Sequence, residues 1–131
     1  MGEFLPIPVR LNEIGTAIVE ASYAVHSTLG PGLLESVYSL CLTEELKSRG
    51  LQVQSQQPLP VVYKGITLEG GYRVDLLVEG EVIVELKAVE IMHPVFEAQL
   101  LTYLKLSGRR LGYLVNFNVP LIRDGIKRMV L

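Results

Sequence analysis

The sequence predicts a single α/β domain in which helices flank a mixed β-sheet. Three observations support this prediction. The 131 residues are 49% hydrophobic and 20% charged, a composition that suits one buried core. Apolar residues recur at helical spacing up to residue 49 and then change to strand-like spacing. A later helical segment separates two apolar strands, and such a crossover implies that these strands are parallel.

Two helices are expected in the first third of the chain. Residues 12–29 carry apolar side chains at helical spacing, and Asn12 is the expected N-cap. The segment Gly30-Pro31-Gly32 breaks this pattern. Residues 33–49 then form the second helix, which we expect Gly50 to end.

Strands and one more helix make up the rest of the expected fold. Short strands are expected at Val53, residues 60–63 and residues 66–68, with a tight turn at Lys64-Gly65, and longer strands at residues 72–78 and 82–87. A helix at residues 94–107, ended by Gly108, and a strand at residues 111–117 follow. The expected order is α-α-β-β-β-β-α-β with a short C-terminal element, in one domain that spans residues 1–131.

Acidic residues interrupt the two longer apolar strands. If residues 79–81 form a three-residue loop whose glycine has a positive φ, Val78 pairs with Val82. Asp75 then lies directly opposite Glu85. A two-residue turn would shift the register by one and put the two carboxylates on opposite faces, so this prediction depends on the loop.

A lysine joins this pair of carboxylates. Because side chains alternate along a strand, Lys87 points to the same face as Glu85. Facing carboxylates are destabilising unless a proton or a cation lies between them. Oxygen ligands of this kind suit Mg²⁺ or Mn²⁺, which could polarise a phosphate and activate water while the lysine holds the nucleophile or the developing charge. An exposed ion pair is the simpler alternative, but burying these charges among apolar neighbours costs stability that an ion pair does not explain.

Glu35, Gln99 and Tyr103 are further candidates with weaker individual support. Glu35 lies on the apolar side of the second helix, although a carboxylate in a first turn is also explained by its interaction with the helix dipole. Gln99 and Tyr103 are four residues apart on the third helix and share a face. Taken alone, these two residues are only a polar patch.

The charge distribution indicates where a nucleic acid would bind. The formal net charge is -2, which excludes a uniformly basic coat protein, but residues 1–104 carry a net -7 and residues 105–131 a net +5. We therefore expect a phosphate backbone to meet Arg109, Arg110, Lys127 and Arg128.

The sequence also argues against several other classes of protein. The single cysteine, Cys41, allows neither an intramolecular disulfide nor a Cys-based zinc site, which favours a cytoplasmic location. No stretch is long and apolar enough to predict a membrane span, and residues 1–6 lack the features of a signal peptide. Phosphate-binding loops and dinucleotide fingerprints are also absent from the sequence.

Several segments resemble one known family. Gly32-Leu33-Leu34-Glu35-Ser36-Val37-Tyr38 is similar to the signature of the GxxExxY proteins, a branch of the PD-(D/E)XK nuclease superfamily. The likeness continues through residues 60–65, 72–78, 84–90, 97–104 and 116–120. The order and spacing of these segments make the resemblance specific over nearly the whole chain.

The resemblance implies a restriction-endonuclease-like core. In such a core the metal and water-activating site would be Asp75, Glu85 and Lys87, the acid from the preceding helix Glu35, and the polar pair of the following helix Gln99 and Tyr103. The sequence keeps every one of these positions. It departs from the broader superfamily at Val74, which stands where a proline would precede Asp75.

Together these observations predict a small nuclease that uses Mg²⁺ or Mn²⁺ to hydrolyse DNA by attack of water. Asp75, Glu85 and Glu35 are the expected metal ligands, Lys87 positions or activates water, and Gln99 and Tyr103 orient the lysine or a phosphate. The alternative is a noncatalytic nucleic-acid-binding or assembly module that keeps the fold. RNA stays open as a substrate, and a homodimer is expected because a lone site would address one strand at a time.

Overall fold

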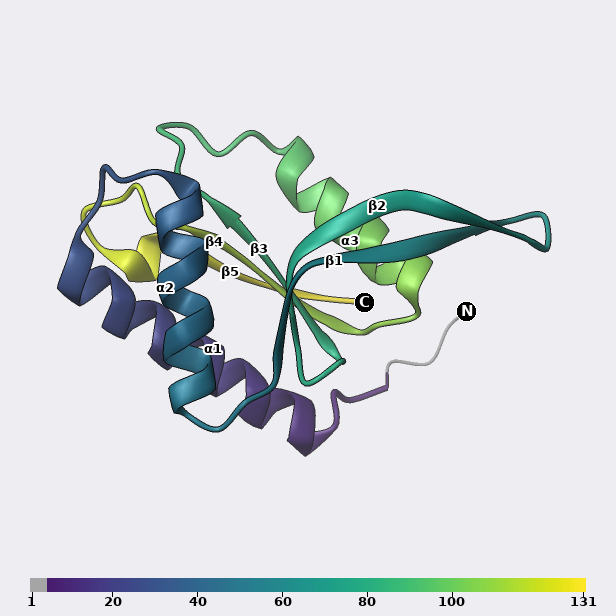
Figure 1. The fold of residues 1–131 in the computed structure, drawn as a ribbon, viewed down its shortest axis with the longest axis horizontal. Helices are drawn as coiled ribbons and strands as arrows, with labels where there is room; N and C mark the ends of the chain where they lie inside the picture. Colours follow the sequence, from purple (N-terminus) through teal and green to yellow (C-terminus); the bar gives the residue numbers. More distant parts are fainter. Residues whose placement is uncertain (1–4) are drawn as a thin grey trace.

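A five-stranded mixed sheet organises residues 5–131, the part of the chain that the computed structural model describes. Its strands, in order across the sheet, are β1 (Val53–Tyr63), β2 (Ile66–Val78), β3 (Val82–Lys87), β4 (Leu111–Asn116) and β5 (Ile126–Val130). Strands β3 and β4 are parallel, and all other neighbours are antiparallel. The predicted α/β class, with a mixed sheet flanked by helices, is confirmed (Figure 1).

Helices cover the two faces of this sheet. On one face lie α1 (Val9–Leu29) and α2 (Glu35–Ser48), and on the other lies α3 (Val95–Ser107), which crosses from β3 to β4 (Figure 1). A short 3-10 helix, η1 (Ile122–Asp124), precedes β5, which is the predicted C-terminal element. Helix α1 begins three residues earlier than predicted because Pro8, not Asn12, is its N-cap. Within residues 5–131, no helix combines the length and apolar character needed to cross a membrane.

Each face of the sheet has its own hydrophobic core. Ile18 of α1 and Leu42 of α2 pack with Val84 of β3, and all three are fully buried. On the other face, Leu100 of α3 packs with Ile83 of β3. Neighbouring residues of β3 therefore serve opposite cores, as the alternation of side chains along a strand requires.

The β1–β2 hairpin is longer than the sequence predicts. The separate strands expected between residues 53 and 78 merge, so three strands rather than four precede α3. Pro58 and Pro60 resemble strand breakers in the sequence, but β1 is an edge strand, where a missing N–H is tolerated. The hairpin extends beyond the body of the molecule and turns at Lys64 and Gly65, which both have a positive φ (Figure 1).

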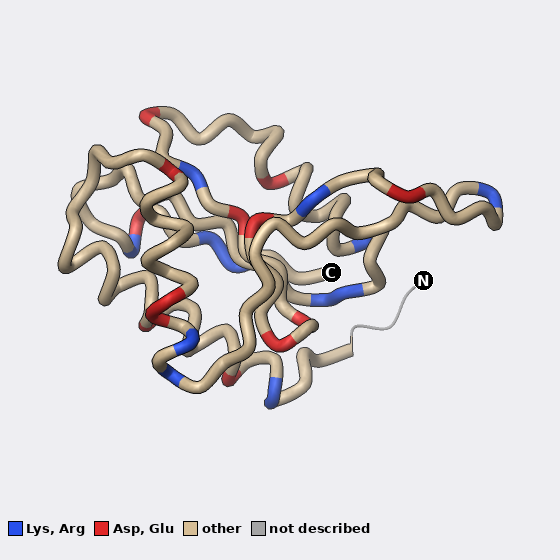
Figure 2. Tube along the Cα trace, viewed as in Figure 1, with Lys and Arg blue, Asp and Glu red and all other residues tan. Residues whose placement is uncertain are grey.

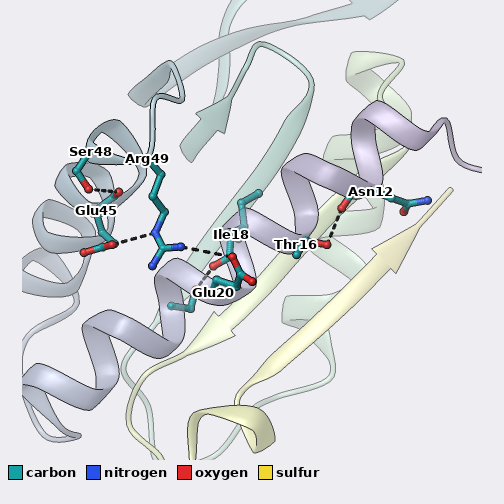
Figure 3. Close-up of polar contacts among 8 residues, drawn as sticks. Asn12, Thr16, Ile18, Glu20, Glu45, Ser48 and Arg49 are labelled. Atoms are coloured by element: carbon teal, nitrogen blue, oxygen red, sulfur yellow. Dashed lines mark hydrogen bonds and ion pairs between the residues drawn. The ribbon is translucent and has the colours of Figure 1, made fainter.

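An arginine at the end of α2 connects the two helices that share a face of the sheet. Arg49 Nε donates to Glu45 at 2.9 Å, and its Nη1 lies 3.5 Å from a carboxylate oxygen of Glu20 on α1 (Figure 3). Ser48 donates to the backbone oxygen of Glu45 in the same turn (Figure 3). Exposed ion pairs contribute only about 0–1 kcal/mol, so the apolar core, rather than this contact, holds the helices together.

Candidate active site

The register of β2 on β3 is the one predicted from the three-residue loop. Val78 pairs with Val82, and Gly80 has a φ of 68° in the turn between them. Continued along the strands, this register sets Asp75 opposite Glu85. The turn therefore decides that two acidic residues from different strands become neighbours.

The backbone pairing of β2 with β3 ends just before these two acids. The last pair is Leu76 with Val84. Beyond it, the backbone N–H of Asp75 donates to Oε2 of Glu85 at 2.7 Å, and the backbone N–H of Leu86 donates to Oδ2 of Asp75 at 2.8 Å. The two carboxylates thus accept amide hydrogens that carbonyl groups accept in a regular ladder. Both carboxylates are fixed at the point where β2 leaves β3.

Glu85 is the most strongly perturbed acid of this group. Only 6% of Glu85 is exposed to solvent. Burial, and then the negative charge of Asp75, raise the pKa of Glu85 to about 8, although the hydrogen bond from the Asp75 backbone and the charge of Lys87 oppose the shift. A cation between the two carboxylates would remove most of this cost, since it would compensate both charges.

A groove along α2 leads to Asp75. It has a volume of about 670 Å³, and its lining includes Glu35 and Thr43 from α2, Gln56 from β1, Asp75 from β2 and Leu86 from β3. Partial burial, and then the charge of Asp75, raise the pKa of Glu35, while Lys87 opposes this shift. Glu35 therefore belongs to the electrostatic environment of the two strand acids.

Lys87 contacts an aromatic ring on the α3 side of the sheet. Its Nζ lies 4.2 Å from the centre of the Phe96 ring, a cation–π contact. No carboxylate oxygen of residues 5–131 lies within ion-pair distance of this Nζ. The simple alternative of a Glu85–Lys87 or Asp75–Lys87 ion pair is thus not what the structure shows, and the ammonium group is held by Phe96 beside the acids.

The two α3 candidates differ in their surroundings. Tyr103 stacks on Tyr72 of β2, with ring centres 4.3 Å apart, and the Tyr72 hydroxyl donates to the backbone oxygen of Tyr103 at 3.2 Å. Burial raises the pKa of the Tyr103 hydroxyl, and the charges of Glu85 and Asp75 raise it further. Gln99 is exposed, and its side chain makes no hydrogen bond within residues 5–131. The charges of the two acids thus act on Tyr103, and Gln99 lies between Phe96 and Tyr103 on the same face of α3.

Three residues of the site were not predicted from the sequence: Gln56, Tyr72 and Phe96. A signal for Phe96 exists, because residues 96, 99 and 103 share one face of a helix. Tyr72 stands three residues before Asp75 on a strand, and its partner is known only once α3 is placed. For Gln56, neither the residue type nor its spacing from other residues indicates in the sequence that it belongs to the site.

The four basic residues expected to meet a phosphate backbone do not lie together. Figure 2 shows that Lys and Arg positions are spread over the molecule. Arg109 donates to the Gly80 oxygen, Arg110 to the oxygens of Leu5, Pro6 and Leu131, Lys127 to Glu97, and Arg128 to Asn12. Arg109 and Arg110 precede β4, at the end of the parallel strands opposite to Lys87. Their shared position in the sequence therefore does not become a shared surface.

The residues present fit a divalent metal of the magnesium type. Within residues 5–131, no group of three or more His, Cys, Asp and Glu side chains is arranged to hold a metal ion. Mg²⁺ does not need such a cage, because it commonly takes one or two carboxylates and completes its shell with water and substrate phosphates. The paired carboxylates of Asp75 and Glu85, where burial and then the charge of Asp75 raise the pKa of Glu85, match this requirement.

Comparison with known proteins identifies the family of the chain. The sequence model of the PD-(D/E)XK nuclease superfamily matches residues 12–129. No curated protein and no solved structure matches the chain. Nucleases of this superfamily act on nucleic acids and generally use divalent metals. Because the match spans nearly the whole chain, the protein belongs to the PD-(D/E)XK nuclease superfamily.

Proposed function

We propose that this protein is a metal-dependent nuclease that hydrolyses phosphodiester bonds of DNA. The observation that supports this most is the pair of carboxylates, Asp75 and Glu85, fixed by backbone amides where β2 leaves β3. Lys87 follows two residues later on the same strand. We also propose that the chain belongs to the GxxExxY branch, since Glu35 of that signature lines the same groove as Asp75.

Asp75 and Glu85 would hold Mg²⁺ or Mn²⁺, and Glu35 of α2 would act on the ion through a bound water rather than as a third direct ligand. A divalent ion in this place supplies positive charge that polarises a phosphate and lowers the pKa of water. The contribution of the chain is positional, because both carboxylates are held in place before substrate arrives. Lys87 donates hydrogen bonds to the nucleophile or to the charge that develops on the phosphate, and Tyr103 and Gln99 orient Lys87 or a phosphate.

Of Arg109, Arg110, Lys127 and Arg128, which do not share one surface, Lys127 is the proposed contact for a phosphate next to the site, and the other three would meet only more distant phosphates. Lys127 has the most direct relation to the acids, because it pairs with Leu114, which pairs with Glu85. Two strand spacings separate Lys127 from Glu85, roughly 10 Å. A nucleic-acid strand bound at Asp75 would therefore reach Lys127 before the other three basic residues. A homodimer would present one such site to each strand of a duplex.

The test is cleavage of labelled single-stranded DNA, duplex DNA and RNA, each with Mg²⁺, with Mn²⁺ and with a chelator. We expect metal-dependent loss of DNA, which Lys87→Ala abolishes. Lys105→Ala is the matched control, because Lys105 is an exposed lysine in the last turn of α3. Binding of nucleic acid without cleavage in any metal would instead identify a noncatalytic module, and cleavage of RNA alone would correct the substrate.

A further inference from the structure

Gln56 has an unusual backbone conformation in the interior of β1. Its φ is 51°, in the left-handed region that residues other than glycine rarely adopt. Two other non-glycine residues within 5–131 share this property, Lys64 and Glu79, and both lie in the turns of β-hairpins, where a positive φ is expected. Gln56 is the one case among these described residues in which strain occurs inside a strand.

The strain does not serve to change the pairing of β1 with β2. Backbone pairs on either side of Gln56 keep one register: Ser55 with Leu76, and Gln57 with Val74. Between them, the position of Gln56 faces Asp75. On β2, Val74 belongs to the core under α3 and Leu76 to the core under α1 and α2, although a regular strand would put both on one face. The change of face along β2 therefore falls at Asp75, opposite the strained Gln56, and is separate from the register shift between Leu59 and Val61.

The side chain of Gln56 contacts the carboxylate of Asp75. Its Nε2 donates to Oδ1 at 3.4 Å, while the backbone N–H of Leu86 donates to Oδ2 at 2.8 Å. Each oxygen of Asp75 thus has one donor, and each keeps a further lone pair for a cation. Gln56 also lines the groove that contains Glu35 and Asp75.

We propose that Gln56 is a positioning residue for Asp75. The side-chain amide of Gln56 holds the Asp75 carboxylate in the orientation that binds a divalent cation. This inference rests on the proposed function and adds a residue to the same site. Strained backbone persists where the surrounding structure imposes it, and such residues cluster at functional sites. Side chains that hydrogen-bond to a metal ligand orient it, and their loss typically weakens metal binding by about 10- to 100-fold.

Two substitutions separate the side chain from the backbone conformation. Gln56→Asn keeps an amide on a residue that enters the left-handed region more readily, but its side chain is shorter by one methylene. Gln56→Gly adopts this φ without steric cost and has no side chain. Gln54→Asn is the matched control, because Gln54 is an exposed glutamine of the same strand, paired with Leu77.

The experiment measures Mn²⁺ affinity by titration calorimetry and the urea midpoint without metal, on the full chain. We expect both Gln56 variants to bind Mn²⁺ about 10-fold or more weakly than wild type, with a urea midpoint equal to or above that of wild type. The control should match wild type in both measurements. An unchanged Mn²⁺ affinity in both variants, or a lowered midpoint in both, would overturn the positioning role while the proposed function stands. Failure of the wild-type chain to bind Mn²⁺ and to cleave DNA would overturn both proposals.

Discussion

The two halves of β3 differ in what surrounds them. Residues 82–84 are fully buried and pair with β2 on one side and with β4 on the other. Residues 85–87 keep the pairing with β4 only, and on the β2 side two carboxylates accept backbone N–H groups in its place. One strand thus has an apolar half inside the sheet and a charged half where the sheet opens.

This difference shows how the fold produces the site. The apolar half fixes the register through the pair of Val78 with Val82, and the register alone places Asp75 opposite Glu85. The charged half carries the cost of burying acids, because the pKa of Glu85 is raised to about 8 by burial and by Asp75. The two halves adjoin each other, and their centres, Ile83 and Leu86, are three residues or about 10 Å apart.

The largest expected effect contrasts one residue from each half. Ile83→Ala removes a fully buried side chain from the core under α3 and should lower the free energy of unfolding by about 2–5 kcal/mol. Lys87→Ala should lower it by only about 0.5–2 kcal/mol, because it removes one cation–π contact. Urea denaturation measures both values. A loss in Lys87→Ala as large as that in Ile83→Ala would mean that the charged half is structural.

The second prediction concerns the pH dependence of the charged half. Because the pKa of Glu85 rises from 4.5 to about 8 on folding, the folded state binds more protons than the unfolded state between these values. The stability contributed by protonated Glu85 is therefore complete below pH 4.5 and is lost as the pH rises through 8.

Glu85→Gln should remove this decline and make the metal-free chain more stable than wild type at pH 8 by at least about 1 kcal/mol. Glutamine can still accept the N–H of Asp75, so the hydrogen bond survives. Urea midpoints from pH 5 to 9 in a chelator test this, with the exposed Glu90→Gln as control. If the urea midpoint of Glu85→Gln fell with pH as steeply as that of wild type, Glu85 would not be the group whose raised pKa causes the decline.

The third prediction addresses how Lys87 is held. Phe96→Leu removes the ring under the ammonium group, a contact that typically contributes about 0.5–2 kcal/mol. The cleavage rate should fall roughly two- to thirty-fold, while Phe96→Tyr, which keeps the ring, should retain it. NMR provides a measurement independent of activity, since ring-current shifts of the Lys87 ε protons should disappear in Phe96→Leu. Unaltered shifts would show that the ring does not hold the lysine.

The smallest expected effect lies outside β3. Replacing Arg109, Arg110, Lys127 and Arg128 together with Ala should flatten the slope of log K against log salt by up to about 0.9 for each duplex phosphate that these residues neutralise in wild type. Among single variants, Lys127→Ala should account for more of the change than Arg110→Ala, because Arg110 already donates to three backbone oxygens. Fluorescence anisotropy gives the slopes. An unchanged slope in the quadruple variant would remove these residues from the binding surface.

Much of this arrangement could be predicted because it depends on local rules. The loop between β2 and β3 determines the register, and a register determines which residues of two strands face each other. The helix between β3 and β4 likewise implies parallel strands, which the structure confirms. Asp75 and Glu85 could therefore be paired without knowledge of the rest of the fold.

The remaining features depend on tertiary context. The φ of Gln56 follows from where β1 passes Asp75, and glutamine has no special preference for that conformation. Phe96 meets Lys87 only because of how α3 lies on the sheet. The basic residues near the C-terminus are close in sequence, but Lys127 and Arg128 point to opposite faces of β5, where they contact Glu97 of α3 and Asn12 of α1.

A crystal structure of the protein with Mn²⁺, located by its anomalous scattering, is the decisive test of whether Asp75 and Glu85 bind a metal. We expect one manganese peak at the opening between β2 and β3, within coordination distance of carboxylate oxygens from both Asp75 and Glu85. Water would complete the shell, and the backbone N–H groups of Asp75 and Leu86 would keep the carboxylates in place. A saturating Mn²⁺ concentration that leaves this position without a peak, or puts the ion on Glu35 alone, would contradict this expectation.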